Sequence, residues 1–241
     1  MEFHIDGRPE DISRYVFCSG SQSRAKITAE NFENVVTISE RRGIVIYSGV
    51  YDGVFMTSCG TGMGGPATAI ALEELGHLGA DTFIRVGSCG VFQNGQKPGD
   101  VIISSGTVRF GGTGNLYLPS EFPAVPTFEV TRTLVAAADE LGIPVRVGVG
   151  IAGDAFYSTQ KKTKYDSVLP GNPIFMEMES DTVFIVGAVR GFRTGALFVS
   201  DGVPGNIKPE SGREAFTNGV ENSIQIALKA MHSIALMDSK N

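Results

Sequence analysis

Short apolar segments separated by turn residues dominate the N-terminal quarter of the chain. Val, Ile, Tyr and Phe are concentrated in these segments, which is typical of β-strands. We predict a first buried strand at 15–20 and three antiparallel strands at 35–39, 44–50 and 54–58. Asp52-Gly53, between the last two strands, is typical of a two-residue hairpin turn.

The rest of the chain alternates between strands and segments with helical periodicity. We predict helices at 67–78, 128–141, 181–189 and 213–237, a shorter one from about residue 25, and strands at 83–86, 101–105, 145–151 and 196–200. Such alternation is typical of α/β proteins. No linker, repeat or low-complexity tract interrupts it, so we expect a single domain over residues 1–241. The irregular segment 107–126 is longer than most loops and is expected to have a functional or interface role.

The segment 83–90 combines a buried strand with a charge that needs a partner. Phe83, Ile84 and Val86 are apolar, and Arg85 interrupts them. A buried guanidinium cannot lose its proton and therefore needs a permanent anion. Two interpretations are equally supported: a carboxylate of the protein, or an anionic ligand. We expect the strand to end in the small-residue loop Gly87-Ser88-Cys89-Gly90, where an oxyanion could approach the main chain.

Two segments that begin with glycine follow strands and precede helices, an arrangement that suits anions. In the first, 20–24, a capping turn with an exposed Arg24 is the favoured alternative. The second, 60–65, matches the G-x-G-x-x-G pattern of dinucleotide-binding folds, which need an acid at the end of the next strand. This chain has Gly87-Ser88 there, and Asp81 stands at the wrong end. We therefore reject a nicotinamide cofactor and keep an anion-binding loop.

Three later segments carry candidate chemistry. Residues 152–162 contain an aromatic pair, an amide and two lysines, which suits a flat polar heterocycle or, equally, an exposed loop. Glu179 could accept hydrogen bonds from two sugar hydroxyls or act as a helix-capping acid, and an exposed position is favoured for Glu177. Asp201 ends a strand where ligands bind in open α/β sheets, or it belongs to an Asp-Gly turn.

Charge and composition exclude several classes of protein. The net charge is −6 with no basic run, which argues against nucleic acid as a partner. We expect no signal peptide and no membrane span. The cysteines Cys18, Cys59 and Cys89 are odd in number and widely spaced, so reduced thiols and a cytoplasmic location are expected. The three histidines are scattered, and we expect no metal site.

Four motifs together resemble the nucleoside phosphorylase family, in the branch that contains uridine phosphorylases and hexameric purine nucleoside phosphorylases. The motifs are 62–66 with its Glu73-Glu74-Leu75 helix, 85–90, 121–125 and 177–179. The resemblance implies one domain with three α/β/α layers around a mixed, partly barrel-like sheet. It also implies a homo-oligomer of dimers, in particular a hexamer, with each site at a dimer interface.

The resemblance also implies a role for individual residues. Arg85, Glu179 and Asp201 are implied to be catalytic. The implied phosphate ligands are Gly20, Arg24, Arg42, Arg85 and Ser88; the implied ribose ligands are His4, Met178 and Glu179; and the implied base ligands are Cys89, Gly90, Phe156, Gln160, Lys162 and Asp201. His4 and Arg42 are expected to come from the neighbouring subunit.

The implied activity is reversible phosphorolysis of a ribonucleoside, with inorganic phosphate as co-substrate and no metal or organic cofactor. Uridine is favoured, although Lys162 stands where uridine phosphorylases have arginine, and Ser200-Asp201 is similar to the purine enzymes. The first alternative is therefore a purine nucleoside phosphorylase that uses Asp201. A nucleosidase and a non-catalytic nucleoside-binding oligomer are further alternatives. Ser21-Gln22 replaces the family's Asp-Pro in the first phosphate loop.

Overall fold

A computed structural model describes residues 2–159, 161–203, 206–207 and 209–240 of the chain. The strands are β1 (Tyr15–Ser19), β2 (Glu33–Ser39), β3 (Val45–Tyr51), β4 (Val54–Gly60), β5 (Thr82–Val91), β6 (Val101–Arg109), β7 (Val145–Ala152), β8 (Phe175–Glu177), β9 (Arg193–Val203) and β10 (Asn206–Ile207). The α-helices are α1 (Gln22–Ala29), α2 (Gly65–His77), α3 (Phe128–Leu141), α4 (Lys161–Asp166), α5 (Ser180–Arg190) and α6 (Arg213–Asp238). Short 3₁₀ turns η1 (Pro9–Asp11), η2 (Arg41–Gly43), η3 (Thr113–Leu116), η4 (Leu169–Gly171) and η5 (Glu210–Gly212) lie between them.

The described strands form one mixed sheet that closes on itself in part. Its order is β10-β9-β6-β7-β8-β5-β1-β4-β3-β2, and an additional parallel pairing joins β9 to β5. That pairing closes β5, β9, β6, β7 and β8 into a ring, while β1 to β4 extend from it as an open sheet. The expected mixed, partly barrel-like sheet is therefore confirmed.

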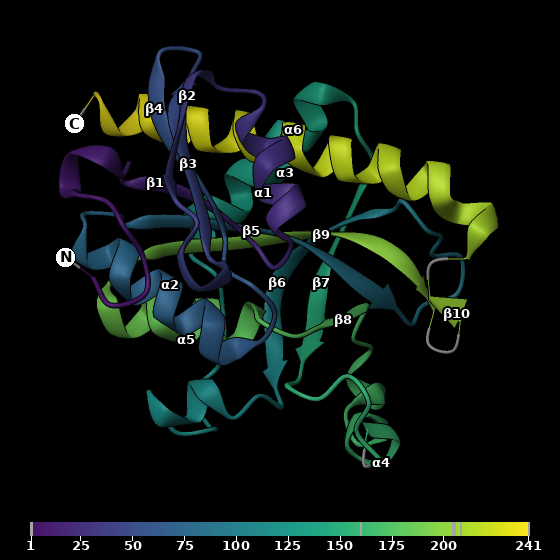
Figure 1. The fold of residues 1–241 in the computed structure, drawn as a ribbon. Coiled ribbons are helices and arrows are strands. Elements are labelled where there is room, and N and C mark those ends of the chain that lie inside the picture. Colours follow the sequence, from purple (N-terminus) through teal and green to yellow (C-terminus); the bar gives the residue numbers. More distant parts are fainter. Residues whose placement is uncertain (1, 160, 204–205, 208, 241) are drawn as a thin grey trace.

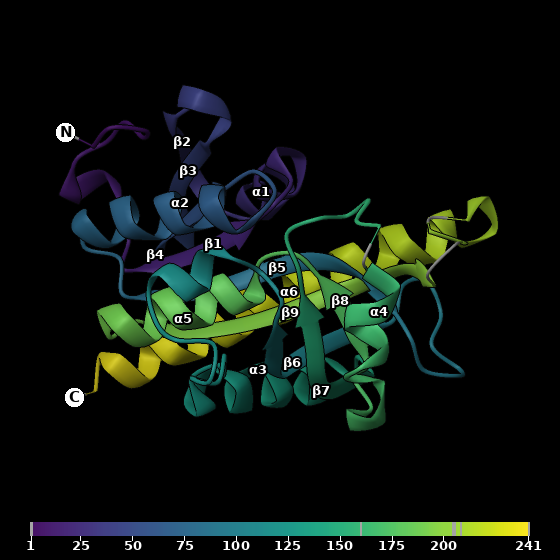
Figure 2. The same cartoon turned by 90° about the horizontal axis from the view of Figure 1, so that it is seen from below.

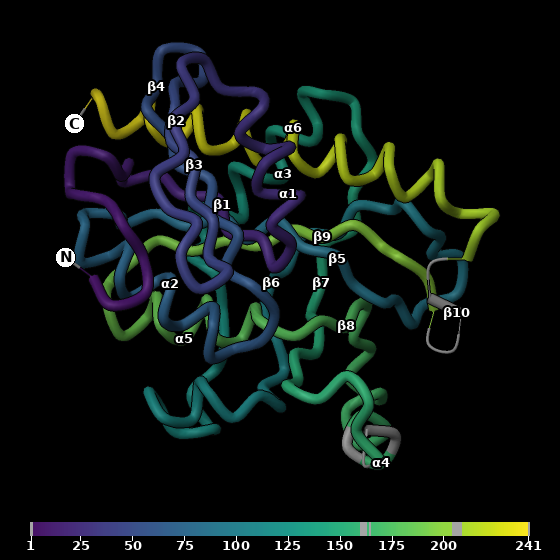
Figure 3. Tube along the Cα trace, in the orientation of Figure 1, coloured from purple at the N-terminus to yellow at the C-terminus, as the bar shows by residue number. Residues whose placement is uncertain are grey.

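Helices cover both faces of this sheet. Figures 1 and 2 show α2 and α5 side by side on one face and α3 and α6 on the other. Each pair buries its apolar stripe, with Leu72 and Phe184 in one core and Leu134 and Leu228 in the other. The chain trace in Figure 3 shows both termini on one side of the molecule, opposite β10. This arrangement confirms the three-layer α/β/α prediction.

Most element predictions agree with the structure to within a few residues. Asp52 and Gly53 have φ angles of 46° and 79°, as the predicted hairpin requires. The helix Phe128–Leu141 has the predicted bounds and ends at Gly142 in the left-handed conformation. The first helix begins at Gln22 rather than near residue 25, because Ser21 caps it. The segment 107–126 is less irregular than expected, since β6 continues to Arg109.

The predicted loop Gly87-Ser88-Cys89-Gly90 is wrong. Strand β5 continues to Val91, and these residues pair with β9 and, at Gly90, also with β8. Closure of the barrel requires the extra length. A Cβ at Gly87 would lie 2.7 Å from the Phe198 ring. The small residues here allow close packing across the barrel, and they do not form a turn.

No helix in the described part of the chain is long and apolar enough to cross a membrane.

Candidate active site

A cavity of about 1140 Å³ lies at the carboxyl ends of the parallel strands β1, β5 and β9. Ligands bind at this edge in open α/β sheets. Most of the predicted site residues line the cavity: Gly20, Arg24, Arg85, Ser88, Cys89, Gly90, Phe156, Met178, Glu179 and Asp201. The fold thus brings together residues from five separate parts of the sequence.

Arg85 is held by two carboxylates and still has a free nitrogen. It is buried in β5, where Nε donates to Glu177 Oε2 at 2.9 Å and Nη2 donates to Glu179 Oε2. Burial alone would lower the pKa of Arg85, but the charges of Glu179 and Glu177 outweigh it and raise the pKa. Nη1 is buried and has no hydrogen-bond partner among the described residues. The structure confirms the carboxylate interpretation of Arg85, and an anionic ligand at the remaining nitrogen stays a prediction.

Arg24 brings a second guanidinium to the cavity. It lies in the first turn of α1 and is only 8% exposed, so the favoured prediction of an exposed arginine is wrong. Its Nη1 donates to the Val86 carbonyl at 3.4 Å, and its Nε has no partner among the described residues. Burial and the nearby charge of Arg85 lower its pKa to about 10, and Asp201 opposes that shift. Two buried guanidiniums with free N–H groups make this end of the cavity suited to an anion.

Glu179 joins the arginine site to the glycine loop after β4. Its Oε1 accepts a hydrogen bond of 2.5 Å from the Gly64 N–H, and Oε2 accepts from Arg85. Gly62 and Gly64 have φ angles of 80° and 93°, which only glycine adopts at low cost. The G-x-G-x-x-G match therefore serves to direct an N–H group at a carboxylate. Glu179 stands at the N-cap position of α5, as the capping alternative expected, but its side chain makes no capping bond to the helix.

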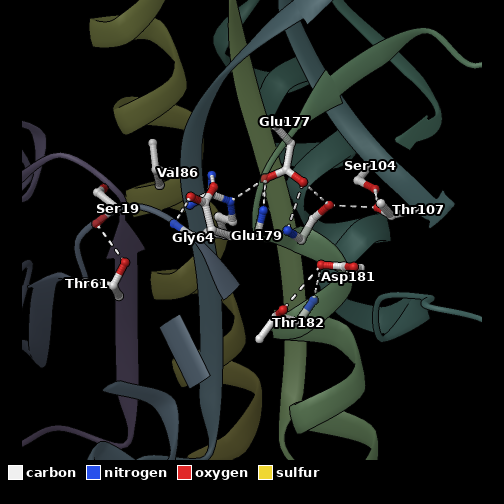
Figure 4. Close-up of polar contacts among 12 residues, drawn as sticks. Ser19, Thr61, Gly64, Val86, Ser104, Thr107, Glu177, Glu179, Asp181 and Thr182 are labelled. Atoms are coloured by element: carbon white, nitrogen blue, oxygen red, sulfur yellow. Dashed lines mark hydrogen bonds and ion pairs between the residues drawn. The ribbon is translucent and has the colours of Figure 1, made fainter. Parts of the chain in front are cut away.

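Glu177 was expected to be exposed, and the structure corrects this. Its side chain is 1% exposed, and its carboxylate accepts from Arg85 Nε and the Glu179 N–H, each at 2.9 Å. It also accepts from the Ser180 N–H at 2.9 Å and the Ser180 hydroxyl at 2.7 Å. Figure 4 shows this carboxylate at the centre of the network that continues through Ser180 to Thr107. Glu177 therefore caps α5 and positions Arg85, a role that the apolar residues on either side of it only hinted at.

Apolar and aromatic side chains also line the cavity. Phe156 and Cys89 are among them, and Phe156 meets Tyr157 edge-on at 4.9 Å between ring centroids. Tyr165, which sequence reasoning missed, also lines the cavity and stacks on Phe110 at 5.7 Å. Burial, and then the charge of Asp201, raises the pKa of the Cys89 thiol well above its ordinary value. Besides the two guanidiniums, the cavity thus offers aromatic surface and the Asp201 carboxylate, as a heterocyclic base would require.

Two predicted base ligands lie outside what the structure describes. Gln160 is not among the described residues, and Lys162 is described only as part of the α4 backbone.

His4 and Arg42 lie away from this cavity. His4 Nδ1 contacts Glu74 Oε1 at 2.6 Å, and Glu74 also accepts from the backbone N–H groups of His4 and Ile5. Arg42 is exposed in the turn η2, with a φ angle of 53°. The single chain therefore does not bring these two residues to the cavity, and their supply by a second subunit stays a prediction.

No group of three or more His, Cys, Asp or Glu side chains that could hold a metal ion occurs within the described residues. The charged groups that line the cavity are the guanidiniums of Arg24 and Arg85 and the carboxylates of Glu177, Glu179 and Asp201, a set that suits an anion beside a polyhydroxyl compound.

Comparison with known proteins places this geometry in a family. The chain is 36% identical to a uridine phosphorylase of Treponema pallidum (strain Nichols), over 99% of this chain and 96% of that protein. It is 32% identical to a guanosine phosphorylase of Halorubrum lacusprofundi, over 96% and 98% respectively. Among solved structures, a uridine phosphorylase of Vibrio fischeri in complex with 6-hydroxy-1-naphthoic acid matches with a TM-score of 0.88 at 27% identity, over 94% of each chain. A family model described as phosphorylase superfamily matches residues 14–236, and the chain therefore belongs to the phosphorylase superfamily.

Proposed function

We propose that this protein is a nucleoside phosphorylase, a pentosyltransferase that cleaves a ribonucleoside with inorganic phosphate, and that uridine is its main substrate. The observation that carries this proposal is the free, buried Nη1 of Arg85. Arg24 lies close enough for the two charges to repel each other, and Glu179 accepts a hydrogen bond from Nη2 of the same guanidinium. The two arginines suit phosphate, and the carboxylate suits a ribose next to it. The similarity to proteins named uridine phosphorylase supports the choice of nucleoside.

The proposed reaction needs no covalent enzyme intermediate. A phosphate oxygen bonds to C1′ of the ribose as the bond from C1′ to the base nitrogen breaks, and the bonding electrons leave with the base. Arg24 and Arg85 hold the phosphate, with Gly20 and Ser88 beside them, and stabilise its charge as it moves. Glu179 accepts hydrogen bonds from the 2′- and 3′-hydroxyls next to Met178, so that C1′ faces the phosphate.

The base is proposed to lie at the aromatic end of the cavity. Phe156 offers a ring face, while Cys89 and Gly90 border the plane of the base. We propose that Gln160 and Lys162 stabilise a departing uracil. Asp201 would instead protonate a purine, and the similarity to a guanosine phosphorylase keeps this alternative in view.

The oligomer and its location are also part of the proposal. We infer dimers assembled into a cytoplasmic hexamer, in which His4 and Arg42 complete a neighbouring subunit's ribose and phosphate sites. No metal or organic cofactor takes part in the proposed scheme.

The proposal is tested by release of free base with and without phosphate. We expect uridine to yield uracil and ribose 1-phosphate only when phosphate is present. Release of base in phosphate-free buffer would show a nucleosidase instead. Binding of uridine without turnover in either buffer would show a non-catalytic nucleoside-binding protein.

Replacing Asp201 by Asn tests which base the site prefers. If uridine is the main substrate, Asp201→Asn should change its kcat/KM less than about threefold, because a pyrimidine needs no acid there. Inosine and adenosine turnover should fall about 10²-fold or more, the usual contribution of a general acid. Faster turnover of inosine than of uridine by the unmodified protein, lost in the variant, would establish the purine alternative.

A further inference from the structure

Asp181 is a buried carboxyl group that the proposed reaction does not use. It is the second residue of α5, two residues after Glu179, and it is 1% exposed. Its Oδ1 accepts from the Thr182 N–H at 2.6 Å and from the Thr182 hydroxyl at 3.3 Å, as Figure 4 shows. Its Oδ2 has no hydrogen-bond partner among the described residues. A buried carboxylate oxygen without a donor is costly, and a proton on that oxygen removes the cost.

A second carboxyl group faces this oxygen across a glycine. Asp181 Oδ2 lies 2.7 Å, and Asp154 Oδ1 3.0 Å, from the point that a Cβ at Gly111 would occupy. The other oxygen of Asp154 accepts from the Gly112 N–H at 2.6 Å. Asp154 stands two residues before Phe156, in a loop whose residues Gly153, Ala155 and Phe156 line the cavity. Asp181, close in sequence to Glu179, and Asp154, close in sequence to Phe156, therefore approach each other at Gly111.

The charges around Asp181 disfavour its ionised form. Glu177 on β8 and Asp154 after β7 are the acids that act on it. Arg109, at the end of β6, directs its guanidinium at carbonyls of residues 118, 119 and 122 and at Asn115. On α2, Glu73 is paired with Arg190. Burial, followed by the charge of Glu177, raises the pKa of Asp181 to about 7, although the Thr182 N–H opposes the shift.

We propose that Asp181 acts, with a proton on Oδ2, as a positioning residue that keeps the Asp154–Phe156 loop close to the N-terminus of α5. It thereby fixes the position of the base pocket relative to Glu179. The part of this inference that concerns the base pocket rests on the proposed function. Loss of the proton places two like charges across Gly111, which drives the loop away from α5. Nucleoside binding should then weaken as the pH rises through neutrality, whereas the proposed phosphate ligands, which do not contact this loop in any described hydrogen bond, should not be affected.

The test uses Asp181→Asn, which keeps the shape and cannot ionise. The KM for uridine at saturating phosphate is measured from pH 5.5 to 9.5. We expect this KM to rise about tenfold in the unmodified protein and to stay flat in the variant, with kcat changed less in both. Asp139→Asn, at an exposed position of α3, is the matched control and should follow the unmodified protein. Identical pH profiles for the unmodified protein and Asp181→Asn would overturn the proposal.

A second variant tests the geometry without changing any charge. Gly111→Ala inserts a methyl group between the two carboxyl oxygens and should raise the KM for uridine at every pH, with little change in the KM for phosphate. An unchanged KM for uridine would contradict the role of this contact.

Thermal unfolding separates failure of this inference from failure of the proposed function, since it needs no substrate. Unfolded aspartate releases its proton near pH 3.8, whereas native Asp181 keeps its proton to about pH 7. The native state thus binds more protons between these values, so stability falls as the pH rises through them. We expect Asp181→Asn to melt about 5 °C or more above the unmodified protein at pH 9 and to lose that advantage by pH 4. A pH-independent difference would overturn the protonated form of Asp181, whether or not any nucleoside is cleaved.

Discussion

Replacing Arg85 by methionine should reduce kcat/KM for phosphate about 10³-fold or more and also destabilise the protein by about 3–5 kcal/mol. The first effect follows from loss of the free Nη1 that faces the cavity. The second follows because Glu177 and Glu179 would remain buried without the cation between them. Steady-state kinetics with varied phosphate and urea unfolding at pH 7 measure the two effects.

Arg24→Gln is the matched control for Arg85→Met. Arg24 also offers N–H groups to the cavity, but Arg85 repels it, and among the described residues no carboxylate forms an ion pair with it as two do with Arg85. We expect Arg24→Gln to lose phosphate affinity and to be as stable as the unmodified protein or more so. Phosphorolysis at the normal rate in Arg85→Met would refute the phosphate role of Arg85. Equal destabilisation by both variants would contradict the view that only Arg85 balances the buried acids.

Replacing Glu177 by alanine should cost about 3–5 kcal/mol of unfolding free energy and reduce activity about 10²-fold or more. The variant removes the acceptor of four hydrogen bonds, which leaves the α5 N-terminus uncapped and Arg85 Nε unpaired. Because Glu179 and Arg85 then shift together, the KM values for uridine and for phosphate should both rise. Urea unfolding and two-substrate kinetics test this.

Two further variants show whether the effect is specific to Glu177. Glu177→Gln keeps one carbonyl oxygen as acceptor and should lose roughly half as much stability as Glu177→Ala. Glu221→Ala, on the exposed surface of α6, should stay within about 0.5 kcal/mol of the unmodified protein. Normal KM values in Glu177→Ala would show that Glu177 does not position the site.

Local sequence predicted a site residue correctly where its residue type, once buried, has few possible structural roles. Arg85 had to find an anion wherever it was buried, and its apolar neighbours predicted burial. Glu179 was identified as a candidate on similar grounds. Glu177 was missed because a carboxylate at a strand end is exposed more often than buried, and only the packing of β8 against β5 and β7 encloses it.

Burial also explains why two predictions based on turn-forming residues were wrong. Gly87 and Gly90 were predicted to form a loop because glycine is typical of turns. In the barrel, their missing side chains make room for Phe198 and Met176. The sequence contains the glycines and the large side chains that fill the space beside them, but nothing in it indicates that they lie next to each other in the fold. Arg24 was expected to be exposed because its neighbours in the sequence are typical of a capping turn. The strand that it contacts, β5, is distant in the sequence.

Periodicity and turn residues alone determined most of the longer elements, their order and the α/β class of this protein, because these depend on contacts within a few residues. The short elements β8, β10 and α4 were not predicted. The motifs alone indicated the family. Only the tertiary structure decided which groups partner the charges. Arg85 donates to two glutamates and keeps one nitrogen free, and the Gly64 N–H donates to Glu179. Asp181 and Asp154 approach each other at Gly111. The physical reason is that burial and the distances between charges arise when the sheet closes, and both depend on residues that are far apart in the sequence.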